Sequence, residues 1–188
     1  ESVKRLKNPK YKVSCHYLIN RKGDIVKMVE EKNIAWHAGK SKWKNDTNLN
    51  EHSIGIELEN KGHEFGYTNF TNNQYISLKK LITFLKINFY IKEKNIIFHS
   101  DIAPNRKKDP GEKFFIKKIG INRFKFNKES EKKYSLYELL ILYGFHKYYV
   151  KKYKKSCIRA VKRSLNYKII TSSQSKKFLK DFYNLLFC

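Results

Sequence analysis

Cysteine is scarce in this 188-residue chain, which holds only Cys15, Cys157 and Cys188. The number is odd, the spacings are long and no Cys-x-x-Cys pair occurs, so we expect neither a disulfide framework nor a zinc knuckle with thiolate ligands. No apolar run reaches the roughly 18 residues of a membrane-spanning helix. Glu1 opens a charged segment that does not resemble a signal peptide. Because this segment does not begin with Met, we expect residue 1 to be a processed end or the edge of a longer protein.

Acidic residues are few, with 17 Asp and Glu against 41 Lys and Arg, which leaves a formal net charge of +24. A field of this sign attracts any polyanion, whether nucleic acid, anionic lipid or an acidic wall polymer. The basic residues are spread along the chain rather than gathered in one block. Lys, Asn, Ile, Tyr and Phe are all abundant, which drift toward A/T-rich codons also produces. We therefore expect nucleic acid to bind only non-specifically, through charge.

The first half of the chain predicts strands and a helix around a buried core. Hydrophobic residues make up 40% of the sequence and aromatic residues 15%, enough for one or two folded domains. Strands are predicted over residues 13–19, 25–29, 53–59 and, briefly, 96–98. The turn at residues 20–24 joins the first two strands as a hairpin. The alternation in the third places Ile54, Ile56 and Leu58 on one face and Gly55, Glu57 and Glu59 on the other.

A helix is predicted after the segment Thr71-Asn-Asn-Gln74, which has the pattern of a capping box. Apolar residues recur behind it at helical spacing and define an inward face. These residues are Tyr75, Leu78, Leu81, Ile82, Leu85 and Phe89. Strand, helix and strand in this order indicate an α/β arrangement of layers.

The character of the chain changes after about residue 115, where a polar, lysine-rich stretch reads as a linker. A second capping box, Ser135-Leu-Tyr-Glu138, opens a short helix that Gly144 ends. Further helices are predicted over residues 153–165 and 173–186. We therefore expect a first domain over residues 1–122, a linker over 123–134 and a small three-helix domain over 135–188.

The segment from His99 to Gly111 carries most of the candidate chemistry. His99 follows a short apolar run, and Lys107 and Asp109 lie on the loop behind it, which Pro and Gly punctuate. An imidazole and a carboxylate are zinc-ligand types, and an ammonium beside them can stabilise a developing oxyanion. The combination suggests metal-assisted hydrolysis. Ten positions separate His99 from Asp109, so only a folded loop could bring them together. The alternative is therefore that His99 is an ordinary loop histidine and that Asp109 only forms a turn with the following proline.

Glu57 is the candidate general base, because it lies in the middle of a strand on the face that Gly55 leaves open. Glu59 competes with it equally on pattern alone, and either could be a solvent-facing strand carboxylate.

The segment Trp36-His37-Ala-Gly39 suits the wall of a substrate cleft, although a packed Trp with a hydrogen-bonded His is an equal reading. His16 in the first strand is expected to be packed rather than a ligand.

Taken together, these stretches resemble the zinc-dependent N-acetylmuramoyl-L-alanine amidases of type 2, which share their fold with the peptidoglycan recognition proteins. Order and spacing agree from residue 11 to about residue 115. The matching stretches are residues 13–19, 35–39, 50–60 and 99–111. The resemblance implies a mixed central β-sheet flanked by helices. It is closest to the envelope branch, whose members carry a C-terminal helical domain similar to peptidoglycan-binding modules.

The resemblance also implies a reaction, hydrolysis of the amide bond between N-acetylmuramic acid and L-alanine in peptidoglycan or muropeptides. His99 and Asp109 would be ligands of a Zn²⁺ cofactor, Glu57 the general base and Lys107 the group that stabilises the oxyanion. A cell-envelope or periplasmic location follows from the resemblance alone, with the cytoplasm as the alternative. We expect the chain to act as a monomer.

The sequence departs from the family pattern at one point. The family has a further zinc ligand, a histidine on a strand ahead of Val13, whereas residues 1–12 contain no histidine. Catalytic zinc sites normally use three protein ligands. The chain is therefore expected to be a piece of a longer amidase or a degenerate relative that binds peptidoglycan without cleaving it. A third reading has His16 or His37 as a substitute ligand.

Overall fold

The computed structural model describes residues 13–124 and 133–187. Most of the predicted linker over residues 123–134, together with Cys188, lies outside these ranges. The chain divides into two compact units, which are described separately. The sheet unit comprises Glu1–Ser41 and Thr47–Tyr90, and the helical unit comprises Lys42–Asp46 and Ile91–Cys188.

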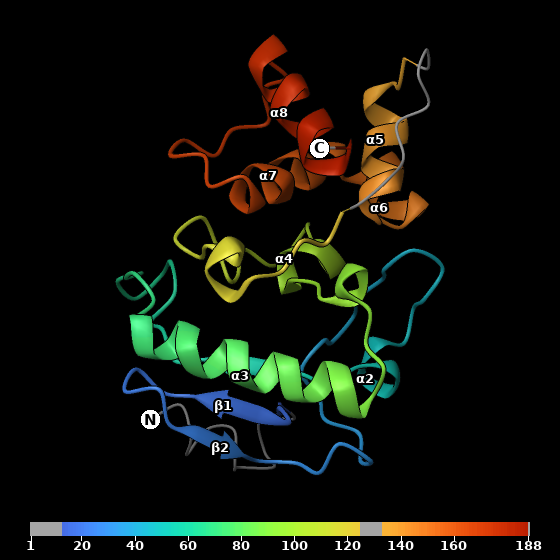
Figure 1. The fold of residues 1–188 in the computed structure, drawn as a ribbon. Coiled ribbons are helices and arrows are strands. Elements are labelled where there is room, and N and C mark those ends of the chain that lie inside the picture. The colour runs from blue at the N-terminus through green and yellow to red at the C-terminus, as the bar shows by residue number, and fades with distance from the viewer. Residues whose placement is uncertain (1–12, 125–132, 188) are drawn as a thin grey trace. The chain divides into compact units, whose positions relative to one another are not determined.

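A mixed sheet of three strands, in the order β2-β1-β3, is the centre of the sheet unit. Strands β1 and β2 are seen side by side in Figure 1. Strand β1 (Tyr17–Ile19) pairs antiparallel with β2 (Ile25–Lys27), which confirms the predicted hairpin. It pairs in parallel with β3 (Ile56–Leu58). All three strands are shorter than predicted. The ladder stops at His16 because the amides of His16 and Tyr17 both donate to the carbonyl of Gly55, so regular pairing cannot continue.

Helix α3 (Asn72–Asn88) begins with the predicted capping box, in which Thr71 and Gln74 each accept from the other's backbone N–H. The Gln74 side chain also donates to the carbonyls of Ile19 and Glu59, so the start of the helix is tied to the sheet. Five of the six predicted inward residues are buried. Phe89 is the exception and is 45% exposed, because the helix ends at Asn88 and the periodicity no longer applies. Short helix α2 (Leu49–His52) precedes β3.

The predicted strand over residues 96–98 is wrong. The 3-10 helix η2 (Glu93–Asn95) and an extended stretch lead into helix α4 (His99–Ile102). The amide of Phe98 donates to the Asp101 carboxylate at 2.9 Å, so a side chain takes the hydrogen bond that a neighbouring strand would have needed. A second 3-10 helix, η3 (Ile116–Ile119), follows.

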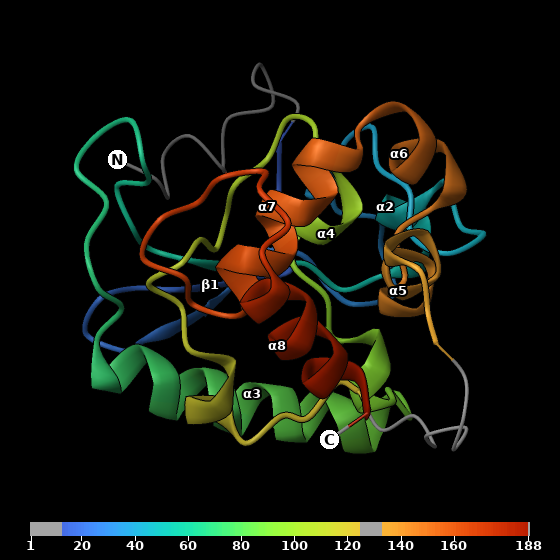
Figure 2. The same ribbon diagram turned by 90° about the horizontal axis from the view of Figure 1, so that it is seen from above.

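Residues 133–187 contain four helices rather than the three predicted (Figures 1 and 2). They are α5 (Leu136–Tyr143), α6 (Lys147–Lys152), α7 (Lys154–Ser164) and α8 (Lys176–Phe187). Helix α6 escaped prediction because it is short and its N-terminal cap is His146 rather than Ser, Thr, Asp or Asn. The predicted capping box at Ser135 and the stop at Gly144 are confirmed. Within the two described ranges, none of the helices is long and apolar enough to cross a membrane.

A shared core joins the C-terminal helices to the residues around His99. Helix α4 packs on α7, and α5 packs on α6 and α8. The rings of Tyr143, Phe145, Phe178 and Phe182 are almost completely buried there. Gly144 has a φ of +120°, and a Cβ atom would lie 2.2 Å from the Trp43 ring, so this turn requires glycine. The functional division into residues 1–122 and 135–188 stays a prediction.

Candidate active site

His99 and Asp109 are in direct contact although ten positions separate them. The Nδ1 atom of His99 lies 2.9 Å from Oδ2 of Asp109. Two backbone hydrogen bonds hold the loop in place, from Ser100 N to the Asp109 carbonyl at 3.0 Å and from Lys107 N to the Ala103 carbonyl at 2.9 Å. The imidazole is 15% exposed and the carboxylate 53% exposed. The pair is therefore a fixed unit that still faces solvent.

The electrostatics of this loop keep the carboxylate ionised. Burial by itself would raise the pKa of Asp109, but the hydrogen bond from His99, the attraction of that imidazole when it is protonated and the positive charge of Lys107 outweigh it, and the net pKa is lowered. Lys107 is thus close enough for its charge to act on Asp109. The helical unit brings all three predicted residues of this segment together.

The pair has the chemistry of two zinc ligands. In a tetrahedral zinc site, two ligand atoms lie about 3.3 Å apart when each bond is about 2.0–2.1 Å long. The separation of 2.9 Å between His99 Nδ1 and Asp109 Oδ2 needs little adjustment to reach that value. Across residues 13–124 and 133–187, no group of three or more His, Cys, Asp or Glu side chains could hold a metal ion. The pair accounts for two ligands of the usual three.

A buried ionic network behind this pair was missed by sequence reasoning. Asp101, on the same short helix as His99, is fully buried and contacts Arg123 Nη1 at 2.6 Å. The hydroxyl of Tyr143 donates to the other oxygen of Asp101 at 2.8 Å. A weak signal was present, because Arg123 stands directly before Phe124 and two residues after Ile121. Nothing in the sequence pattern pairs it with a carboxylate 22 residues earlier.

In the sheet unit, Glu57 of β3 and Glu59, which directly follows β3, differ in a way that the alternating pattern could not show. Glu57 lies at the middle of the strand opposite Leu18 and is half-buried. Burial raises the pKa of the neighbouring Cys15 thiol to about 12, and the negative charge of Glu57 adds to this effect. The Glu59 carboxylate accepts from the backbone N–H of Arg21 at 2.9 Å, which anchors the hairpin turn. Glu59 therefore has a structural role in the turn, and Glu57 stays the candidate base.

His16 is packed, as the sequence analysis expected. Its Nδ1 atom accepts from the N–H of Gly55 at 3.0 Å, so its Nε2 atom must donate to the carbonyl of Asn33 at 3.1 Å. Both ring nitrogens of His16 are engaged and the residue is only 1% exposed. The alternative that His16 replaces a zinc ligand is therefore wrong for this fold.

The space that Gly55 leaves open is filled by the His37 ring rather than lying beside Glu57. A Cβ atom on Gly55 would meet Cγ of His37 at 2.3 Å. His37 Nε2 lies 3.3 Å from the carbonyl of Ser53, and its backbone N–H donates to Asn50 at 3.1 Å. Trp36 is 56% exposed, so the reading of a packed tryptophan is wrong and its ring faces solvent.

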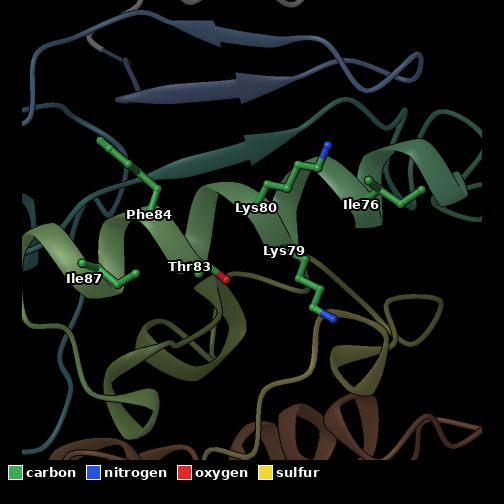
Figure 3. Close-up of a pocket in the computed structure, with 6 residues that line it drawn as sticks. All are labelled: Ile76, Lys79, Lys80, Thr83, Phe84 and Ile87. Atoms are coloured by element: carbon green, nitrogen blue, oxygen red, sulfur yellow. The ribbon is translucent and has the colours of Figure 1, made fainter.

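A hollow on the outer face of α3 contains none of the predicted site residues (Figure 3). Its lining consists of Ile76, Lys79, Lys80, Thr83, Phe84 and Ile87. No carboxylate, imidazole or thiol is among them, so this hollow has no metal ligand and no general base. The predicted site residues lie elsewhere: Glu57, Trp36 and His37 belong to the sheet unit, and His99, Lys107 and Asp109 belong to the helical unit.

Sequence comparison links this set of residues to a known family of enzymes. A family model described as N-acetylmuramoyl-L-alanine amidase matches residues 1–112. The N-acetylmuramoyl-L-alanine amidase AmiD of Escherichia coli is 42% identical over 114 residues, which cover 54% of this chain and 41% of that protein. The 1,6-anhydro-N-acetylmuramyl-L-alanine amidase AmpD of Haemophilus influenzae is 39% identical over 104 residues, or 55% of this chain and 54% of that protein. The chain thus spans about half the length of these relatives.

Structural comparison extends the similarity to the C-terminal helices. The structure of AmiD from E. coli with anhydro-N-acetylmuramic acid-L-Ala-D-gamma-Glu-L-Lys matches with a TM-score of 0.80 and 28% identity. The match covers 98% of this chain and 82% of that one. The structure of AmpDh3 from Pseudomonas aeruginosa with anhydromuramic pentapeptide also has a TM-score of 0.80 and 28% identity, and the match covers 97% and 84% of the two chains.

Proposed function

Because the chain belongs to the N-acetylmuramoyl-L-alanine amidase family, we propose that it hydrolyses the amide bond between N-acetylmuramic acid and L-alanine in peptidoglycan or muropeptides. The observation that carries this proposal is the contact between His99 and Asp109 at 2.9 Å, with the charge of Lys107 acting on the same carboxylate. These three residues belong to the stretch that the family model matches.

His99 and Asp109 would hold a zinc ion through an imidazole nitrogen and a carboxylate oxygen. When bound, zinc supplies Lewis-acid polarisation of the reacting carbonyl and of water. The lowered pKa of Asp109 supports this role, because a ligand carboxylate must be ionised. The family's further histidine would complete the ligand set in a longer protein. His99 and Asp109 alone would hold the metal weakly.

Glu57 acts as the general base in this proposal. It takes a proton from the attacking water and later delivers that proton to the departing amine of L-alanine. Lys107 stabilises the negative charge that develops on the carbonyl oxygen. The exposed ring of Trp36, with His37 beside it, provides an apolar wall against which the sugar or the peptide stem can lie.

The substrate class suggests where the protein acts. We propose a cell-envelope location, since the bond to be cleaved belongs to the cell wall. Residues 135–188 would contribute to peptidoglycan binding, and the protein would act as a monomer. The net charge of +24 favours contact with acidic wall polymers, while nucleic acid would bind without sequence preference.

The decisive experiment compares two neighbouring glutamates. Glu57→Gln should abolish the release of L-alanine-led peptides from muropeptides, followed by mass spectrometry, while zinc content and unfolding temperature stay near the parent values. Glu59→Gln is the matched control and should mainly lower the unfolding temperature, because Glu59 anchors the hairpin turn. A version extended upstream with a strand that carries the family's further histidine should be assayed in parallel. The proposal is refuted if this extended protein, with zinc bound, releases no such peptide.

A non-catalytic wall-binding role is the second candidate. It is favoured by one observation, that residues 13–124 and 133–187 supply no group of three metal-ligating side chains. This role predicts that the protein sediments with insoluble peptidoglycan equally well with and without a chelator. Loss of sedimentation after zinc removal would count against it.

A further inference from the structure

We propose that the buried network of Asp101, Arg123 and Tyr143 positions His99 for metal binding, so that the core of the helical unit is part of the catalytic apparatus. These three are positioning residues, since none of them touches the proposed metal. The inference rests on the proposed function, because it assigns a role toward the same zinc site. It also assigns the C-terminal helices a task other than binding peptidoglycan.

Both oxygens of the Asp101 carboxylate accept hydrogen bonds. One oxygen contacts Arg123 Nη1 at 2.6 Å and accepts from the Phe98 amide at 2.9 Å. The other accepts from the Tyr143 hydroxyl at 2.8 Å. Asp101 is completely buried, and Arg123 and Tyr143 are 6% and 1% exposed. A fully buried carboxylate held by three donors cannot move without leaving a buried donor unpaired.

The Asp101 carboxylate also fixes the backbone on both sides of His99. Helix α4 is a single turn of four residues, which has almost no stability of its own. Asp101 lies two residues after His99, and its side chain binds the amide of Phe98, the residue just before His99. The Arg123 guanidinium also lies 4.4 Å from the centre of the Phe98 ring. The position of the imidazole is thereby set by Asp101 and Arg123.

The network extends into the core formed by the C-terminal helices. Tyr143 is the last residue of α5, and its hydroxyl also lies 2.7 Å from the Ser164 hydroxyl at the end of α7. Arg123 donates to the Tyr143 hydroxyl at 2.8 Å. Burying an ion pair brings little net stability, because desolvation offsets the attraction between the charges. A fixed geometry for α4 is what this arrangement provides instead.

The test compares two Tyr→Phe variants, each made in the protein extended upstream with the family's further histidine, and each removes one Tyr–Asp hydrogen bond. Tyr143→Phe removes the bond to Asp101 and keeps the ring packed on Phe145. Tyr167→Phe is the matched control and removes the bond to Asp181 at 2.5 Å, on α8. Zinc affinity is measured by competition with a chromophoric chelator. Hydrogen exchange of the amides of residues 98–103 is measured in the zinc-free protein.

We expect Tyr143→Phe to weaken zinc binding by about tenfold, as loss of a supporting contact behind a ligand typically does. It should also speed amide exchange in residues 98–103, while Tyr167→Phe changes both quantities less than twofold. Equal effects of the two variants, or no effect of Tyr143→Phe, would overturn the inference. If the protein extended upstream with the family's further histidine binds no zinc, the proposed function fails. In that case the rate of amide exchange in residues 98–103 of the zinc-free protein still tests whether the network stabilises helix α4.

Discussion

Replacing Gly55 by alanine should destabilise the protein through a clash with one identified ring. The new Cβ atom would lie 2.3 Å from Cγ, 2.6 Å from Cδ2 and 2.7 Å from Nδ1 of His37. No positive φ is involved at this position, so the cost is steric alone. Inserting a methyl group into a well-packed site typically costs about 1–3 kcal/mol.

The His37 ring has little freedom to move away from the added methyl group. Its root atom Cγ is the nearest neighbour, the backbone N–H is held by Asn50 at 3.1 Å, and Nε2 lies 3.3 Å from the Ser53 carbonyl. We therefore expect the full overpacking penalty, near 2 kcal/mol. Because Glu57 follows two residues later on β3, amidase turnover in the extended, zinc-loaded protein should fall as well.

A double-mutant cycle isolates this clash. Urea unfolding is measured for the parent, Gly55→Ala, His37→Ala and the double variant. Removing the ring makes room for the methyl group, so the double variant should be less destabilised than the sum of the single changes, by about 1–2 kcal/mol. Additive free energies of unfolding would show that His37 does not occupy this space and would refute the reasoning.

Three further predictions concern buried or partnered ionisable groups. Arg123→Met should lower the free energy of unfolding by about 3–5 kcal/mol, measured in urea, because it leaves the buried Asp101 carboxylate uncompensated; a loss below about 1 kcal/mol would contradict the burial described. The pKa of Asp109 is lowered on folding, so its contribution to stability is present above its unfolded pKa and disappears as the pH falls through the lower folded value. Asp109→Asn should therefore flatten the acid side of the unfolding-temperature profile of the zinc-free protein, and an unchanged profile would argue against the pairing. Burial raises the pKa of Cys15 and Cys157 to about 12, so alkylation at pH 8 mapped by mass spectrometry should spare both until urea is added.

Local signals along the chain predicted the parts of this fold that depend on near neighbours. Both capping boxes and the glycine stop after α5 rest on hydrogen bonds within a few residues, and all are confirmed. The hairpin and the inward face of α3 also follow from short-range periodicity. The errors arose where a residue distant in the sequence determines the local conformation. The segment 96–98 is apolar enough for a strand, but the Asp101 carboxylate takes the amide that strand pairing requires.

The proposed catalytic and metal-binding residues and their order could be predicted from the sequence, because His99, Lys107 and Asp109 stand in a recognisable loop and Glu57 stands in an alternating strand. Which of these side chains touch each other was a matter for the tertiary structure, since Nδ1 of His99 and Oδ2 of Asp109 meet only when the loop folds back.

Tertiary packing alone decided the remaining questions. Only the folded structure shows that Glu59 accepts a hydrogen bond from the hairpin turn and that both ring nitrogens of His16 are hydrogen-bonded. It also shows that the His37 ring occupies the space next to Gly55. It also paired Arg123 with a carboxylate 22 residues away. The physical reason is the range of the interactions. Periodicity and capping depend on residues three or four positions apart, whereas burial, ion pairs and ring contacts depend on residues that only the finished fold brings together.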